Sequence, residues 1–172
     1  VSIGVKSGDL YVDYIQGQSV HLNADAGRIL SVAGTLNNVK SDSLVLLANN
    51  GIGLFNDYLK VDTSNLTAHT KSGSIFVKQT TDHQLNLVSN DQSGHAITTG
   101  GGSINIDSDG LINVQNEIVN LAEGDINIFA KDDINQNADI LTAGKGNIHV
   151  VSGNNINMHV DLLNNIVAKA ST

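Results

Sequence analysis

The sequence contains no cysteine and no proline, and only 3% of its residues are aromatic. Without cysteine the chain can form no disulfide, no thiolate metal site and no cysteine nucleophile, so its stability must come from packing and hydrogen bonds. Basic residues are also scarce, because 9 Lys and Arg are outnumbered by 17 Asp and Glu and the net charge is −8. A surface that binds phosphates is therefore excluded, and we expect no nucleic-acid partner.

Long apolar runs are missing as well. No window approaches the roughly 18 consecutive apolar residues of a membrane-spanning helix, so we expect no membrane span. Apolar residues at i, i+3, i+4 and i+7 are not sustained over successive turns, which argues against amphipathic helices. The chain is rich instead in asparagine and glycine, which are poor helix formers and common in turns.

The C-terminal third of the chain is repetitive, because Gly102, Gly124 and Gly146 stand at equal spacing and open three similar units. Each glycine precedes the same alternation of apolar and polar residues, and the three units contain Ile104-Asn105-Ile106, Ile126-Asn127-Ile128 and Ile148-His149-Val150. Two further apolar segments follow in each unit. Alternation with a period of two predicts β-strands whose aliphatic side chains point to one side and whose polar side chains point to the other.

These strands are too short to bury an apolar face alone, but successive units can stack in parallel so that each unit becomes one coil. We therefore predict an all-β fold, a right-handed parallel β-helix or β-solenoid of about seven coils with three short strands per coil, the handedness following the bias of parallel crossover connections. At about 4.8 Å per coil, the rod would be about 34 Å long. The first inward residues of the coils are predicted to be Leu10, Leu30, Ile52, Ile75, Ile104, Ile126 and Ile148.

One coil is longer than the others, because Ile75 and Ile104 stand further apart than any other two successive residues of this series. The extra residues are rich in Ser, Asn, Asp and Gly, so we predict a loop insertion at 89–101 that bulges from the surface. Both ends of the chain run directly from repeating material, and the first residue is Val1 rather than methionine. We expect residues 1–172 to be a single β-helix segment excised from a longer repetitive protein.

The units Gly73–Val77 and Gly124–Ile128, and the order of segments from Leu44 to Val77, resemble a known family. They are similar to the repeats of filamentous-haemagglutinin-like adhesins, the large exoproteins that Gram-negative bacteria export by two-partner secretion. The resemblance implies a right-handed β-helical stalk segment that is extracellular, either secreted or held at the bacterial cell surface, with a role in adhesion and virulence. Its nearest partners would be adjacent coils and domains of the same long chain.

Two columns of polar residues are predicted on the outside of the rod. One contains Asn113, Asn135 and Asn157, and the other contains Asn105, Asn127 and His149. Two interpretations stay open for them. The amides can form hydrogen-bonded ladders along the rod, or asparagine is simply a tolerated outward residue.

Glu117, Asp139 and Asp161 also share a coil position, which would stack three carboxylates about 4.8 Å apart. Ca²⁺ prefers several oxygen ligands and could bind between them, so these residues are the candidate metal site. The alternative is a solvated acidic edge that is screened by salt. The glycine-rich calcium-binding nonapeptide repeat is absent from the sequence.

Some β-helices are polysaccharide lyases or hydrolases, so a catalytic role has to be considered. Hydrolysis needs two carboxylates about 5 Å or about 6.5–9.5 Å apart. Here the acidic residues lie in turns or in one column, and the single arginine, Arg28, has no evident acidic partner on a neighbouring coil. The six histidines form no repeat-spaced cluster and are predicted to be surface residues. We predict that the chain is not an enzyme and binds no cofactor.

Tyr11 and Phe76 each lie between two inward residues and are predicted to face solvent, unless they pack beneath a loop. Together with Asn90, Asp91 and His95 of the insertion, they are the candidate contacts for a host cell-surface protein or glycan. The leading hypothesis is a structural rod or stalk segment that mediates or supports adhesion. The alternative is a receptor- or glycan-binding module in its own right, and the third hypothesis is a polysaccharide lyase or hydrolase.

Overall fold

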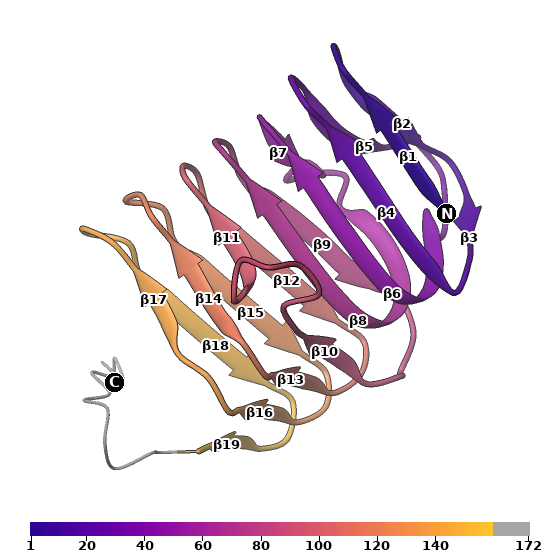
Figure 1. The fold of residues 1–172 in the computed structure, drawn as a ribbon. Helices are drawn as coiled ribbons and strands as arrows, with labels where there is room; N and C mark the ends of the chain where they lie inside the picture. Colours follow the sequence, from indigo (N-terminus) through magenta and orange to yellow (C-terminus); the bar gives the residue numbers. More distant parts are fainter. Residues whose placement is uncertain (160–172) are drawn as a thin grey trace.

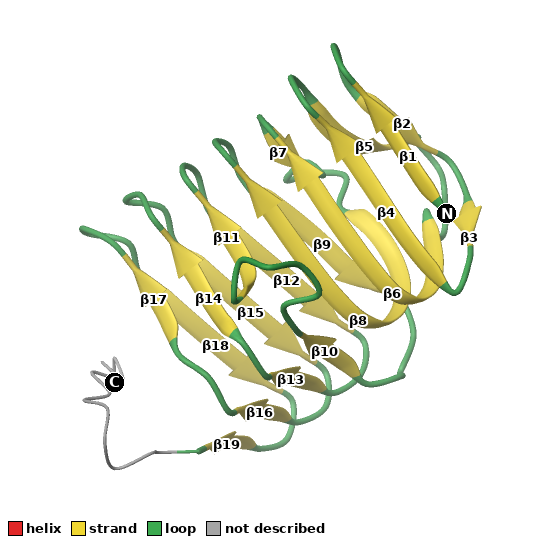
Figure 2. Cartoon of the chain, viewed as in Figure 1, coloured by secondary structure: helices red, strands yellow, loops and turns green. Residues whose placement is uncertain are grey.

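Parallel strands stacked along one axis form a β-solenoid in residues 1–159, the part of the chain that the computed structural model describes (Figure 1). Every ladder between its named strands is parallel, and no residue in this range is helical (Figure 2). Residues 1–159 complete about 7 turns. The predicted all-β parallel β-helix and its approximate number of coils are therefore confirmed.

Each coil contributes strand segments to three faces of the solenoid. The first face contains β1 (Ser2–Val5), β4 (Ser19–Ala24), the second halves of β6 (Val39–Ala48) and β8 (Leu59–Thr70), β11 (His95–Thr99), β14 (Glu117–Asn120) and β17 (Ile140–Thr142). The second face contains β2 (Leu10–Val12), β5 (Arg28–Ser31), β7 (Gly51–Ile52), β9 (Ile75–Gln79), β12 (Ile104–Ser108), β15 (Ile126–Ala130) and β18 (Ile148–Ser152). The third face contains the middle of β8 (Asn65 and Leu66), which pairs with β10, and then β10 (Leu85–Leu87), β13 (Ile112–Val114), β16 (Ile134–Gln136) and β19 (Ile156–Met158). The starts of β6 and β8 extend the second face, because β3 (Ile15–Gln16) pairs with the start of β6 and the start of β8 pairs with β9.

Strands β6 and β8 are longer than the short strands that the repeat predicts, with 10 and 12 residues. β8 runs without a break past the corners of the solenoid, because it pairs with β9 at its start, with β10 in its middle and with β11 at its end. β6 and β8 pair with each other along almost their whole length. Neither strand contains glycine. These two coils therefore form the most continuous part of the sheet.

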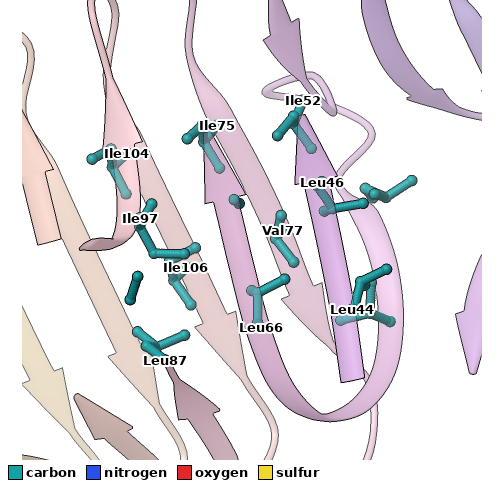
Figure 3. Close-up of a cluster of buried hydrophobic side chains, with 14 of the residues drawn as sticks. Leu44, Leu46, Ile52, Leu66, Ile75, Val77, Leu87, Ile97, Ile104 and Ile106 are labelled. Carbon is teal, nitrogen blue, oxygen red and sulfur yellow. The ribbon is translucent and has the colours of Figure 1, made fainter. Parts of the chain in front are cut away.

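The interior consists of aliphatic columns to which each coil contributes one residue (Figure 3). At the start of the second face, register pairs join Leu10, Ile29, Ile52, Ile75, Ile104, Ile126 and Ile148. Side chains of this kind contribute about 1.5–3 kcal/mol each when they are fully buried. The predicted register is wrong at one coil, where Ile29 occupies the column and Leu30 pairs with Tyr11. Because Ile29 and Leu30 are both apolar, the alternation of apolar and polar residues could not show which of them points inward.

The insertion is shorter than predicted. Only Ser89–Gly94 leaves the sheet, whereas His95–Thr99 of the predicted loop 89–101 is strand β11. β11 pairs with β8 through Ile97–Thr99 and with β14 on its other side. Gly100–Ser103 is then the ordinary corner between the first and second faces. Buried Ala96 and Ile97 explain the difference, because they supply the inward residues that a surface loop would lack.

The outward asparagines form ladders, which decides between the two interpretations of these columns. On the third face, side-chain amides link Asn65, Asn86, Asn113, Asn135 and Asn157 from coil to coil, with N···O distances of 2.7–3.2 Å. On the second face, Asn127 donates to Asn105 at 2.9 Å, and His149 is the next residue of that column in register. Each of these bonds contributes about 0.5–1.5 kcal/mol net, so the ladders stabilise the stacking of the coils in addition to the main-chain hydrogen bonds.

A further column of polar residues, which is buried, stabilises the corners between the first and second faces. Buried Asn120 donates to the carbonyl oxygens of Gly102 at 2.9 Å and of Gly124 at 2.7 Å. Thr99 occupies the equivalent position one coil earlier and is also buried. Gly102 has a φ of +82°, and a Cβ on Gly124 would overlap the Gly102 carbonyl, so side chains are excluded from both positions.

Candidate functional site

The insertion Ser89–Gly94 is anchored at its base by a buried hydroxyl on strand β8. Thr67 donates to the carbonyl oxygen of Val88 at 2.6 Å and accepts the main-chain N–H of Asn90 at 2.9 Å. Thr67 lies between the β8 residues that pair with β10 and those that pair with β11. Its hydroxyl therefore replaces the ladder contacts that are lost where the loop leaves the sheet. The Asn90 amide donates to the Ser43 hydroxyl at 3.1 Å, which extends the loop across the first face.

His69 and Asp91 hold the loop over the first face. His69 Nε2 lies 2.9 Å from Asp91 Oδ2, and the imidazole side chain is only 17% exposed. Burial lowers the pKa of His69, which the charge of Asp91 opposes in part and the neighbouring His95 reinforces. Burial also acts to raise the pKa of Asp91, but hydrogen bonds from Ser93 outweigh it and hold that pKa below its usual value. His69 is thus a half-buried residue on the outside of β8 that the loop partly covers.

A second pair lies beside the first. His95 begins β11 and pairs in register with Glu117 at the start of β14. His95 Nδ1 lies 3.0 Å from Glu117 Oε2, and both side chains are partly exposed. The structure thus brings together three of the predicted site residues, Asp91, His95 and Glu117, and adds His69, whose role the sequence did not indicate. We name these four residues the loop cluster.

The candidate calcium site combines Glu117 with Asp139 on the next coil and with Asp161. Glu117 is in contact with His95, and Asp161 lies outside the described residues. In residues 1–159, no group of three or more His, Asp or Glu side chains has an arrangement that could hold a metal ion. The loop cluster consists of two contacts between a histidine and a carboxylate in this structure.

The two predicted aromatic contacts lie in different environments. Tyr11 is 64% exposed, as the alternation predicts. Phe76 also points outward, but it packs beneath the loop between β7 and β8, with ring centroids 5.4 Å from Tyr58 and 6.1 Å from Phe55. Phe55 is 75% exposed and is therefore the ring that this surface presents to solvent.

Lysine and aspartate side chains form a row of ion pairs across the second face. Lys78 Nζ lies 2.8 Å from Asp107 and 3.3 Å from Asp109, and Lys131 Nζ lies 2.7 Å from Asp109. The hydrogen bond from Lys131 is the main cause of the lowered pKa of Asp109. The two lysines come from the coils on either side of these aspartates.

Comparison of the chain with protein-family models, with curated proteins and with solved structures gave no match. In residues 1–159, no helix is long and apolar enough to cross a membrane. The likeness to filamentous-haemagglutinin-like adhesins thus rests on the repeat residues alone.

Proposed function

We propose that this chain is a segment of a stiff, right-handed β-helical rod in a secreted or surface-bound bacterial adhesin, where it spaces or supports the parts that adhere. The observation that carries the proposal is the unbroken parallel pairing from the first described coil to the last. The resemblance of its repeats to filamentous-haemagglutinin-like adhesins supplies the cellular setting of this proposal.

Main-chain hydrogen bonds in a parallel solenoid run along the rod axis, so they resist bending and stretching in that direction. The aliphatic columns and asparagine ladders follow the same axis. Each coil contacts only its neighbours, so length can grow by adding coils while the cross-section stays the same. Such a modular element is suited to a spacer.

Duplication of two coils tests this modularity. Residues 104–147 comprise two complete repeats, and inserting two further copies of this segment in tandem adds four coils. We expect small-angle X-ray scattering to show a particle longer by about 19 Å, at about 4.8 Å per coil, with an unchanged cross-sectional radius. The matched control inserts the same residues in scrambled order. Growth of the cross-section, or equal behaviour of the scrambled insert, would contradict the proposal.

A second candidate function is receptor binding by the insertion. The observation that favours it is that Asn90, Gln92 and Ser93 are exposed while Thr67 and His69 hold the loop backbone in place. Loops on a rigid scaffold commonly carry recognition. Replacing 89–94 by a Gly-Ser turn should abolish saturable binding to epithelial cells or matrix proteins, whereas the Phe129→Ala variant should retain it. Binding that is unaffected by the replacement would exclude the loop as the contact.

A further inference from the structure

A polar groove lies on the outer surface of the first four coils, away from the loop cluster. It has a volume of about 400 Å³, within the range of small-molecule sites. Its lining comes from consecutive coils and includes Gln16, Gln18, Lys40, Asp62, Ser64 and His83. No apolar side chain lines it. The groove is absent from the sequence-based predictions because its residues share no motif.

The lining residues follow the axis of the rod. Gln16, Lys40 and Asp62 pair in register across β3, β6 and β8, so their side chains repeat at about 4.8 Å, the distance between neighbouring strands. A row of polar groups with this repeat fits an extended ligand that presents hydrogen-bonding groups at regular intervals.

The floor of the groove is held in place before any ligand arrives. Lys40 Nζ lies 2.7 Å from Asp62 Oδ2, and the Thr81 hydroxyl donates to Asp62 Oδ1 at 3.2 Å. Burial acts to raise the pKa of Asp62, but the hydrogen bonds from Lys40 and Thr81 and the charge of Lys40 outweigh it, so that pKa is lowered. His83 Nδ1 lies 3.6 Å from the same carboxylate. These contacts fix the donors and acceptors, which reduces the entropy lost on binding.

An exposed tyrosine contacts one of the lining residues. Tyr14 is 54% exposed, and its hydroxyl donates to Oε1 of the lining residue Gln16 at 2.9 Å. The hydrogen bond to Asp62 is the main cause of the raised pKa of Lys40. Tyrosine offers an apolar face for stacking together with a polar tip.

We propose that this groove binds a neutral oligosaccharide, with Tyr14 stacking on a sugar ring and the row from Gln16 to Asp62 hydrogen-bonding to its hydroxyl groups. The lining favours a polar, uncharged ligand, because its side chains are Gln, Lys, Ser, Asp and His. An anionic ligand would meet Asp42 and Asp62 on a chain of net charge −8. This activity goes beyond the role of a rod and does not depend on it.

Binding is tested on the ¹⁵N-labelled chain by amide chemical shifts during titration with maltohexaose, cellohexaose, xylohexaose and chitohexaose. We expect at least one of these neutral probes to shift the amides of Gln16, Gln18 and Ser64 saturably, with a Kd between about 10 μM and about 1 mM. Tyr14→Ala should weaken binding at least about tenfold, and Tyr14→Phe, which keeps the ring, should weaken it less. Phe129→Ala, an exposed aromatic remote from the groove, should bind like the unaltered chain.

Three results would overturn the proposal. The first is that none of the four probes produces a saturable shift. The second is saturable binding that Tyr14→Ala and Gln18→Ala leave intact while their spectra show the folded state. The third is a response to an anionic heparin hexasaccharide alone. None of these results would contradict the proposed rod, because the duplication of residues 104–147 tests the rod without any ligand.

Discussion

The core column makes a quantitative prediction at Ile126. This side chain is fully buried and packs in register between Ile104 and Ile148. Replacing it by alanine removes about three methylene equivalents, worth about 2.4 kcal/mol at about 0.8 kcal/mol each. The cavity left between rigid neighbouring coils adds a further term, so we expect a total loss of about 3–4 kcal/mol. Ile126→Asp should cost more, because it buries a carboxylate without a partner.

The assay is thermal unfolding followed by circular dichroism, with hydrogen exchange to locate the effect. A loss of about 3 kcal/mol corresponds to a Tm lower by about 6–12 °C in a chain of this size. Phe129→Ala is the matched control in the same strand, because Phe129 has outward parity and is 43% exposed. Its effect should be within about 1 kcal/mol. A larger effect from Phe129→Ala than from Ile126→Ala, or an unchanged Tm in Ile126→Asp, would refute the register.

Further predictions concern the ladder, a corner and the loop. Asn135→Ala removes bonds to Asn113 and Asn157 and should cost about 1–2 kcal/mol in denaturant unfolding, whereas exposed Asn137→Ala should cost little. Gly124→Ala forces a Cβ against the Gly102 carbonyl and should cost about 1–3 kcal/mol in the same assay, whereas Gly4→Ala, with its nearest atoms at 3.7 Å, should be tolerated. The folded-state pKa of His69 lies below its usual 6.5, so the unfolded chain binds the proton first and stability falls as the pH drops from 6.5 to that lower pKa. His69→Gln should remove this part of the pH dependence of the Tm, and the same substitution at exposed His149 should leave it in place.

The fold could be predicted because its strongest determinant is local. Isoleucine alternates with asparagine at the same position of each repeat, and the strands β12, β15 and β18 pair in that register. The prediction lost accuracy where the sequence is ambiguous. Ile29 and Leu30 are both apolar, so only the neighbouring coils determine which of them points inward.

The loop cluster was only partly predictable from the sequence. The wide spacing between Ile75 and Ile104 located the insertion, and with it Asp91 and His95. The partners of these residues come from other coils, since His69 stands one coil before Asp91 and Glu117 one coil after His95. Their proximity depends on how each coil stacks on the next one, and the composition of the loop does not reveal this stacking. The groove was missed for the same reason, because Gln16, Lys40 and Asp62 become neighbours only when the coils stack in register.

Axial stacking of the coils is the claim on which the rod, the loop cluster and the groove all depend, and spin-label distances measure it directly. Because the chain has no native cysteine, labels can be placed at Tyr11 and, in separate variants, at Asn105, Asn127 or His149. These outward positions share one column, so double electron–electron resonance should give distances of about 19, 24 and 29 Å, one strand spacing more for each added coil. Distances that do not increase by about 5 Å with each added repeat would contradict the stacked register.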